Sequence, residues 1–441
     1  MSLRWLSHPM AFVLAAAVLN TLWFHGPLWS YLGAHLDLET GSGWATALAV
    51  AWIPTFLSLV CNAVLAVVSK RLLKGVLIVS FVCNALALYF MQQYAAVLDK
   101  SMMGNVWNTN PDEVMQLWHP GMLWHLLLWA GLPSLLVWLW PLRHVSRWHN
   151  WVGLALYPVA ALALLYALSF TWLWIDRHAG EVGSRLLPWS YVINSIRYQR
   201  EQSETHMSFE PLPDATPLPL GPKPRVVVLV IGESARADKQ SLLGYDRETN
   251  EQLKSVGAVA LPGVRACASY TLAALNCILS ARGDLAPSRS DMGEPLPTYL
   301  YRQKVEVIWR TSNSGQPPMD IARFEPLAEI QPVCDKATCP SRFYDEHLLE
   351  GLPELLSQSK FQRVLVVLHL SGSHGPAYNE KYPPEFERFK PVCRSVILKD
   401  CDRDSLHNAY DNSIAYTDHV LGRLTRVLQA LDASTAWLYI S

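Results

Sequence analysis

Arg225-Val-Val-Val-Leu-Val-Ile-Gly-Glu233 is a continuous apolar, β-branched run that ends at a glycine and a carboxylate. Runs that are apolar on both faces are typical of central strands in a parallel sheet. Val364-Leu-Val-Val-Leu-His369 and Trp437-Leu-Tyr-Ile440 have the same character, and segments with helical patterns, 344–357 and 404–431, lie between the strands. This order predicts an α/β domain with helices on both faces of its sheet.

The carboxyl ends of these strands are where a site is expected, because the ligand sites of open parallel sheets form there. Glu233 and the turn Ser371–His374 each follow such an end. Glu233 could supply a hard carboxylate ligand to a divalent metal, and His374 could hold a phosphate or a second metal. The structural alternatives are a helix-start glutamate and an ordinary loop histidine.

Cys267-Ala-Ser-Tyr-Thr-Leu-Ala-Ala-Leu-Asn-Cys277 places a hydroxyl, that of Thr271, near the start of a run with helix-forming composition. Unpaired N–H groups and the macrodipole stabilise an alkoxide or a phosphate at a helix start. A metal shared with Glu233 would lower the pKa of the Thr271 hydroxyl and make it a nucleophile. The alternative is an N-cap threonine beside a structural disulfide. Together with His374, these residues point to phosphoryl or sulfuryl transfer.

The composition separates this domain from the first part of the chain. The 441 residues are 51% apolar and 17% charged, below the roughly 25% charged residues of an ordinary soluble protein, and the deficit lies almost wholly before residue 176. The length suits about two to three domains. A net charge of -1 without a basic stripe gives no indication of nucleic acid binding.

Five apolar runs in the first part are long enough to cross a membrane, which takes roughly 20 helical residues. Tryptophan and tyrosine residues gather at their ends, as they do at membrane interfaces. We therefore predict a membrane anchor of five helices, near 10–32, 44–68, 75–97, 120–141 and 152–174.

Basic residues set the orientation of these spans. Lys70, Arg71 and Lys74 lie between the second and third spans, and Arg143 and Arg147 lie between the fourth and fifth. By the positive-inside rule, the N-terminus is cytoplasmic and everything after the fifth span lies outside.

A proline-rich linker separates the two parts of the chain. Residues 176–210 are mixed and include an amphipathic piece suited to a membrane surface, and prolines are dense from Pro211 to Pro224. Prolines at that density suit a semi-rigid, extended spacer. The predicted divisions are a transmembrane domain at 1–175, an interfacial and proline-rich linker at 176–224, and an outer domain at 225–441.

Six cysteines of the outer domain lie in three short-range couples. An even number of closely paired cysteines outside the cytoplasm predicts disulfides. A zinc site built from cysteine is disfavoured, because no CxxC pair or matching histidine cluster accompanies them. The couples are Cys267 with Cys277, Cys334 with Cys339, and Cys393 with Cys401.

The predicted outer loop 98–119 carries polar residues at a spacing of four. Asn105, Thr109 and Glu113 would share one face of a helix. Pro111 argues against a regular helix through the middle of this loop. From the residues alone, a solvated loop is the favoured interpretation.

Several short motifs together carry a family resemblance. The chain resembles the membrane-anchored phosphoethanolamine transferases of Gram-negative bacteria, which include the lipid A-modifying and mobile colistin resistance enzymes. The resemblance covers nearly the whole chain and implies five spans, a linker and an outer domain like that of sulfatases and alkaline phosphatases. The motifs are Gly232-Glu-Ser-Ala-Arg236, Leu243-Gly-Tyr-Asp-Arg-Glu-Thr-Asn250, the Cys267–Cys277 segment, Asn313-Ser-Gly315, Ser373-His-Gly-Pro376 and Ala409-Tyr-Asp-Asn412.

The resemblance implies a role for each matching residue. Glu233 would be a zinc ligand, and Thr271, also at the zinc, would be the nucleophile that becomes modified by phosphoethanolamine. Two further groups of residues are implied. Asn313, Ser314 and His374 would line the head-group or phosphate site, and Asn105, Thr109 and Glu113 would handle the lipid donor.

The implied reaction is a ping-pong transfer that depends on zinc. Phosphatidylethanolamine would give its head group to Thr271 and release diacylglycerol, and a lipopolysaccharide-type glycolipid (lipid A or a core sugar) would then accept the group. The resemblance places the protein in a bacterial inner membrane with its catalytic domain in the periplasm, and we expect a monomer. The alternatives are a related sulfatase-fold hydrolase, a phosphoglycerol transferase, or a catalytically dead membrane protein.

Some positions depart from the family pattern. The family has Cys-Gly-Thr and Ser-Val-Pro-Cys around the nucleophile, where this chain has Cys267-Ala-Ser and Ala274-Leu-Asn-Cys277. A family histidine is replaced after Cys401, and a family lysine is replaced near Pro317. These differences leave a core sugar or a periplasmic glucan open as the acceptor.

The family's late strand continues into Asp-His-Gly-Glu, whose aspartate and histidine complete the zinc site, whereas this sequence ends at Ser441. The resemblance therefore predicts a fragment or a truncated product. Glu233 and Thr271 would be its only metal ligands, which is too few for a zinc site. We expect this polypeptide alone to be inactive and the full-length product to be active.

Overall fold

The computed structural model describes residues 7–109, 114–115, 117–143, 147–204, 211–216, 219–285, 292–330 and 343–441. The chain divides into two compact units. A helical unit comprises Met1–Trp107 and Trp118–Gln199, and an α/β unit comprises Asn108–Leu117 and Arg200–Ser441. Residues 176–199 of the predicted linker therefore pack with the helical unit, and the division falls after them.

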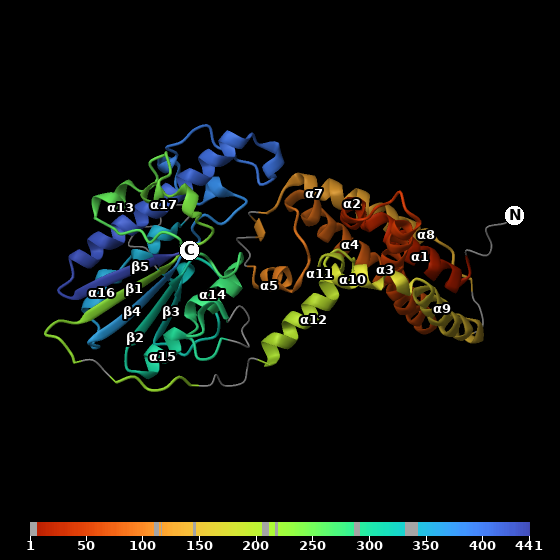
Figure 1. Ribbon diagram of the computed structural model, residues 1–441, viewed down its shortest axis with the longest axis horizontal. Helices are drawn as coiled ribbons and strands as arrows, with labels where there is room; N and C mark the ends of the chain where they lie inside the picture. The colour runs from red at the N-terminus through yellow and green to blue at the C-terminus, as the bar shows by residue number, and fades with distance from the viewer. Residues whose placement is uncertain are drawn as a thin grey trace. The chain divides into compact units, whose positions relative to one another are not determined.

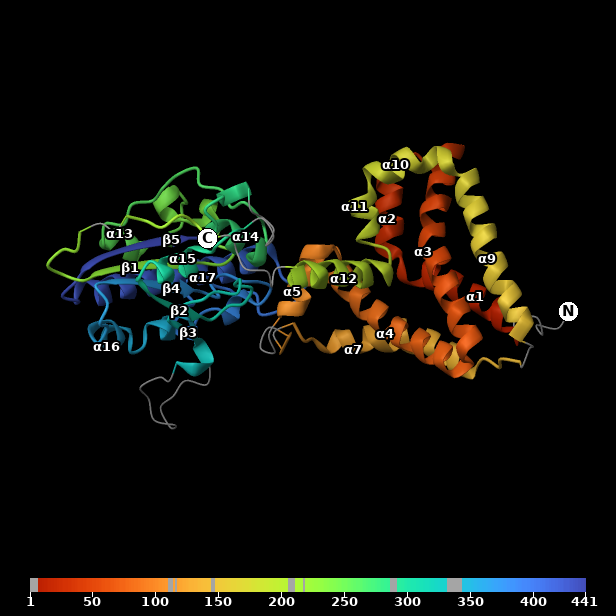
Figure 2. The same ribbon diagram turned by 90° about the horizontal axis from the view of Figure 1, so that it is seen from below.

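The helices up to residue 204 form the bundle that Figures 1 and 2 show in red to yellow-green. They are α1 (Pro9–Phe24), α2 (Gly26–His35), α3 (Gly41–Val68), α4 (Lys70–Tyr94), α5 (Lys100–Asn108), α7 (Pro120–Leu126), the π-helical turn η2 (Leu127–Gly131), α8 (Leu132–Leu139), α9 (Arg147–Ala167), the 3₁₀ turn η3 (Ser169–Thr171), α10 (Trp172–Arg177), α11 (Ala179–Gly183) and α12 (Trp189–Glu204).

Among the described residues of this unit, three helices are long and apolar enough to cross a membrane, and the number rises to five if each of two bent pairs is one span. The continuous spans are α3, α4 and the stretch Pro120–Leu139. The first predicted span is bent by 66° between α1 and α2, where Pro27 lacks the N–H that would continue the helical ladder. The fifth is bent by 57° between α9 and the segment Ser169–Arg177, and Figure 2 shows α10 turning away from the end of α9.

Hydrogen bonds inside the bundle hold the start of α12. Asn20 donates to the carbonyl of Leu187 (3.0 Å) and accepts a hydrogen bond from Asn84 (2.7 Å). The Tyr191 hydroxyl donates to the Asn84 side-chain carbonyl (3.0 Å). The amphipathic piece that the sequence suggested for the membrane surface thus has its first turn tied to α1 and α4.

The α/β unit is built on a five-stranded, fully parallel sheet in the order β3-β2-β4-β1-β5. All three strands expected from the apolar runs are present. At the carboxyl end of the sheet, Ile231 aligns with His369 on one side and with Ile440 on the other. The strands are β1 (Arg225–Ile231), β2 (Glu306–Thr311), β3 (Arg323–Pro326), β4 (Arg363–His369) and β5 (Ser434–Ile440).

Helices cover both faces of this sheet, as the sequence predicts (Figure 1). One core joins β1, β2 and β4 to α13 (Glu251–Ser255), α16 (Leu352–Ser357) and α17 (Arg403–Gln429). The other joins the opposite faces of the same strands to α14 (Thr271–Leu279) and α15 (Leu296–Arg302). Short 3₁₀ turns complete the unit, namely η4 (Ala237–Lys239), η5 (Ser241–Leu243), η6 (Gly283–Leu285), η8 (Leu327–Glu329), η9 (Asp345–Leu349), η10 (Tyr378–Glu380), η11 (Pro384–Phe386) and η12 (Leu398–Asp400).

A buried carboxylate on α17 holds the loop that follows β1. Asp411 is fully buried and accepts hydrogen bonds from the Tyr245 hydroxyl (2.8 Å) and the Arg247 guanidinium (3.0 Å). The ammonium of Lys239 lies 3.6 Å from its other oxygen. Two cations thus compensate one buried charge. These contacts join the sequence motif 243–250 to the motif 409–412.

Candidate functional site

The site centres on Glu233 and Thr271, which the fold brings together from distant parts of the chain. Glu233 lies just beyond β1, and Thr271 is the first residue of α14. The Thr271 hydroxyl donates a hydrogen bond to Glu233 Oε2 at 2.7 Å. The preceding residue, Tyr270, makes no side-chain capping bond to this helix. A charged group bonded to Thr271 Oγ1 would therefore sit at a helix N-terminus that favours negative charge.

The Glu233 carboxylate has two further partners. Ser234 donates to Oε1 (2.7 Å), and Asn313 Nδ2 donates to Oε2 (3.3 Å). Ser234 has a left-handed backbone with φ of +52°. The Tyr410 hydroxyl stabilises this bend, because it donates to the Ser234 carbonyl (2.6 Å) and accepts from the Arg236 N–H (2.9 Å).

A disulfide joins the segment before α14 to the helix itself. Cys267 and Cys277 are bonded, with Cα atoms 6.6 Å apart, and the bond brackets Thr271 as the sequence predicts. Cys393 and Cys401 are also bonded. The third predicted couple, Cys334 and Cys339, lies outside the described residues.

The turn 371–374 packs directly on the backbone of Glu233. Gly372 has φ of +49°, and a Cβ atom there would lie 2.9 Å from both the nitrogen and the carbonyl oxygen of Glu233. The Ser373 N–H donates to the Glu233 carbonyl (2.9 Å). The turn thus reaches Glu233 through its main chain. His374, whose side chain carried the sequence hypothesis, has its Nδ1 2.7 Å from the Gly375 carbonyl oxygen.

The turn 313–315 forms another wall of the site. Asn313 Nδ2 also donates to the Leu370 carbonyl (3.1 Å), while its own side-chain oxygen accepts from the Ser314 N–H (2.8 Å). Gly315 has φ of +89°, and a Cβ atom there would lie 3.8 Å from the Thr271 methyl. The turn therefore brings the Asn313 side chain into hydrogen-bond contact with Glu233 and places Gly315 beside Thr271.

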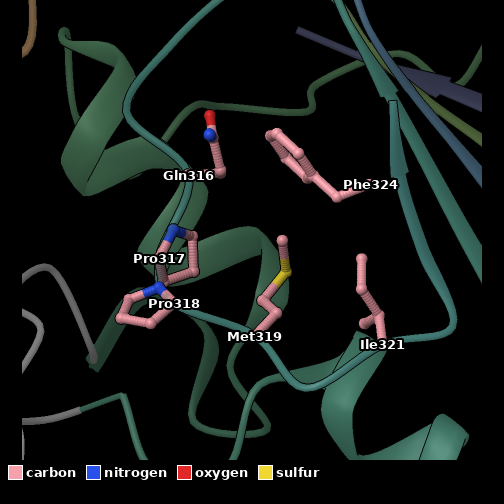
Figure 3. A pocket seen from close by; sticks show the side chains of 6 residues that line it. All are labelled: Gln316, Pro317, Pro318, Met319, Ile321 and Phe324. Atoms are coloured by element: carbon pink, nitrogen blue, oxygen red, sulfur yellow. The ribbon is translucent and has the colours of Figure 1, made fainter. Parts of the chain in front are cut away.

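A pocket of about 350 Å³ follows this turn along the chain. Its lining is apolar except for one amide, and Figure 3 shows the Phe324 ring facing the proline and methionine side chains across the hollow. The lining residues are Gln316, Pro317, Pro318, Met319, Ile321 and Phe324.

The sequence did not single out a histidine that lies beneath the site. His369 ends β4, is fully buried, and lies 3.3 Å through Nδ1 from the Thr311 hydroxyl. Burial lowers its pKa to about 4, against the opposing effect of the Glu233 charge. The ring is therefore neutral at physiological pH. The sequence signal that could have indicated His369 is a polar residue at the end of an otherwise apolar strand.

Comparison with known proteins identifies the chain. Residues 57–203 match the family described as phosphoethanolamine transferase EptA/EptB, and residues 225–441 match the sulfatase family. Phosphoethanolamine transferase EptA of Helicobacter pylori is 34% identical over 382 residues, which cover 86% of this chain and 71% of that protein. The chain belongs to the phosphoethanolamine transferase family.

Two more proteins are similar to this transferase. Phosphatidylethanolamine transferase Mcr-1 of Escherichia coli is 30% identical over 398 residues, which cover 84% of this chain and 72% of that protein. The structure of lipooligosaccharide phosphoethanolamine transferase A of Neisseria meningitidis, an integral membrane protein, superposes with a TM-score of 0.81 at 24% identity, and the match covers 98% of this chain and 81% of that one. The predicted fold of a helical membrane part joined to a sulfatase-like domain is thereby confirmed.

The remaining predicted residues are three in the segment 98–119, and Ser314. Asn105 is within α5, and Thr109 follows the end of that helix. Glu113 lies outside the described residues, so the structure does not show whether the three share a face. Ser314 contributes its main chain to the turn at Asn313.

The donor atoms at the site suit part of a metal centre. Glu233 Oε2 and Thr271 Oγ1 are hard oxygen donors 2.7 Å apart, so one cation could contact both. The described part of the chain contains no cluster of three or more His, Cys, Asp or Glu side chains placed to hold a metal. Zinc sites use three or four protein ligands. The residues in place therefore make only a partial donor set for zinc.

Proposed function

We propose that this transferase takes phosphoethanolamine from phosphatidylethanolamine, holds it on Thr271, and passes it to a lipopolysaccharide-type glycolipid. The hydrogen bond of 2.7 Å between Thr271 and Glu233 carries the proposal, because it gives a hydroxyl at a helix start a proton acceptor. The similar Mcr-1 is a phosphatidylethanolamine transferase, which supports the choice of donor.

In the first half-reaction, Thr271 Oγ1 forms a bond to phosphorus as the bond from phosphorus to the diacylglycerol oxygen breaks. The hydroxyl proton passes to Glu233, and the diacylglycerol oxygen takes up a proton from water. Developing negative charge next to Oγ1 is stabilised by the first-turn N–H groups of α14. Asn313 and Ser234, which donate to the carboxylate, keep Glu233 oriented toward the threonine.

In the second half-reaction, an oxygen of the acceptor forms the new bond to phosphorus and releases its proton to water. The bond from phosphorus to Oγ1 breaks, and Oγ1 regains its proton from Glu233. Glu233 and Thr271 would be two of the ligands of a zinc ion, which would lower the pKa of the Thr271 hydroxyl when bound.

The same proposal assigns handling of the donor lipid to Asn105, Thr109 and Glu113. It also places the α/β unit on the periplasmic face of a bacterial inner membrane, with the N-terminus in the cytoplasm. The basic residues in the first two turns of α4, Lys70, Arg71 and Lys74, and the disulfides Cys267–Cys277 and Cys393–Cys401 support this orientation.

Mass spectrometry of Thr271 tests the proposal. The full-length product is purified with its membrane unit, mixed with zinc and vesicles of phosphatidylethanolamine, and digested to release the peptide that carries Thr271. We expect a gain of one phosphoethanolamine on that residue, loss of the gain in Thr271→Val, and its retention in Thr271→Ser. An unmodified threonine with donor and zinc present would refute it.

The glycolipid product then separates a transferase from a hydrolase. A tetra-acylated glucosamine disaccharide bisphosphate, added to the same vesicles, should acquire the phosphoethanolamine that Thr271 loses. Release of free phosphoethanolamine into water at the same rate, with or without this glycolipid, would instead support the sulfatase-fold hydrolase.

A further inference from the structure

Asp345 is a buried carboxylate that joins the ends of two strands beneath Glu233. Its side chain is 3% exposed. Oδ1 accepts hydrogen bonds from the Ser312 hydroxyl, just after β2, at 2.5 Å and from the Ser371 N–H, just after β4, at 3.0 Å. Oδ2 accepts from the Gly372 N–H at 2.9 Å. The carboxylate lies in η9, outside the strands that it joins.

The two N–H groups from residues 371 and 372 are successive, and Gly372 is left-handed. Successive N–H groups in such a bend form a concave site for an anion. Here the protein fills that site with its own carboxylate. The negative charge of Asp345 therefore fixes the conformation of the turn.

The conformation of this turn determines where Glu233 lies. Gly372 touches the Glu233 backbone so closely that a Cβ atom would lie 2.9 Å from it, and the Ser373 N–H donates to the Glu233 carbonyl. A shift of the turn would move the Glu233 backbone, and its carboxylate would leave Thr271. Asp345 is thus connected to the Thr271–Glu233 pair by two successive backbone contacts.

We propose that Asp345 is a positioning residue for the transfer reaction, which it serves by holding the turn 371–373 against Glu233. This role rests on the proposed function. A buried charge costs free energy unless hydrogen bonds compensate it. Among the described residues no cation forms an ion pair with Asp345, so hydroxyl and N–H donors carry that compensation. The carboxylate is needed because both of its oxygens must accept.

Asp345→Asn is the direct test, because it keeps the shape and replaces one acceptor with an NH₂ group. That NH₂ group must face one of the two backbone donors, so the turn opens. We expect the single-turnover rate of Thr271 modification to fall on the order of 100-fold, as a 1 Å misplacement can produce. The phosphatidylethanolamine concentration at half-maximal rate should stay within about two-fold, since Asp345 contacts no donor group in the proposal.

Gly372→Ala perturbs the same contact from the other side. The added methyl would press on the Glu233 backbone and would strain a left-handed residue while leaving the Asp345 side chain intact. The same fall in rate is expected, and the double variant with Asp345→Asn should be no slower than the slower single variant, because both changes act through one turn. Ser312→Ala keeps both backbone bonds of Asp345 and should cost less than either.

Asp432→Asn is the matched control, because Asp432 is 89% exposed and lies far along the chain from the turn. Thermal unfolding of every variant checks that it is folded. Two results would overturn the positioning role: an unchanged rate in a folded Asp345→Asn protein, or rate losses for Asp345→Asn and Gly372→Ala that multiply. If Asp345→Asn does not fold, the rates of Thr271 modification in Gly372→Ala and Ser312→Ala test the positioning role, and unchanged rates in both would overturn it. An unmodified wild-type Thr271 would instead refute the proposed function.

Discussion

Asp411→Asn should destabilise the α/β unit strongly, although Asp411 is not part of the site. Asp411 is fully buried between the cations Lys239 and Arg247, whose side chains are 13% and 38% exposed. Breaking a buried ion pair by removing one partner costs roughly 3–5 kcal/mol, because the remaining charge is left without compensation.

The lower end of that range applies here. Arg247 keeps a hydrogen bond to Asn408 (2.6 Å) and is partly exposed, and Lys239 keeps one to the Tyr245 hydroxyl (2.8 Å). We therefore expect a loss of about 3 kcal/mol. For a domain of about 150–250 residues, each kcal/mol shifts the unfolding midpoint by roughly 2–4 °C, so the midpoint should fall by about 6–12 °C.

Differential scanning calorimetry of the detergent-solubilised protein measures this shift, with Asp432→Asn as the control. A second variant combines Asp411→Asn with Arg247→Met and so removes one of the two cations that Asp411→Asn leaves without a counter-charge. It should recover part of the lost stability. The reasoning fails if the Asp411→Asn midpoint lies within about 2 °C of wild type, which would be less than 1 kcal/mol. It also fails if the double variant is less stable than Asp411→Asn alone.

Two further predictions concern the donor and pH. Asn105→Ala should raise the phosphatidylethanolamine concentration at half-maximal rate of Thr271 modification and leave the maximal rate unchanged; a fall in maximal rate alone would contradict the assigned role. Asp418 accepts hydrogen bonds from the N–H groups of Gln252 and Leu253, yet burial raises its pKa from 3.8 to about 6. A raised folded pKa means that its contribution to stability is present below pH 3.8 and is lost as pH rises through about 6. Calorimetry from pH 4 to 7 should show this decline in wild type and a flatter profile in Asp418→Asn; identical profiles would argue against it.

The strands that the sequence predicts correctly are those whose burial needs only apolar residues. β1, β4 and β5 are such strands, whereas β2 and β3 were not foreseen. β2 contains Arg310, which is buried and forms an ion pair with Glu325 of β3 (2.8 Å). Each charge interrupts the apolar pattern of its own strand, and only the pairing of the two strands compensates both. A single-sequence pattern contains no information on that pairing.

The site residues that local sequence patterns indicate were predicted, and those that act through distant main-chain atoms were not. Glu233 and the start of α14 follow from strand ends and helix composition, and the fold places them within hydrogen-bond distance. The contributions of Asp345 and Tyr410 do not follow, because each acts on main-chain atoms of residues distant in sequence. Local patterns likewise did not indicate the bend at His25, where a proline follows within two residues of an otherwise apolar run.

The strand order also sets a sequence of assembly. β1 lies between β4 and β5, and its Val226 pairs with Val364 on one side and Thr435 on the other. Pairings between residues so far apart form slowly, and an unpaired apolar strand is prone to aggregate until they do. The bond between Cys267 and Cys277 closes a short loop, and on the proposed location of the α/β unit it can form before β4 and β5 have crossed the membrane. Under the proposed periplasmic location of the α/β unit, we therefore expect folding to pass through a state in which the helix that begins at Thr271 is already held by its disulfide while β1, which leads to Glu233, is still unpaired. A periplasmic chaperone would have a defined target in that state.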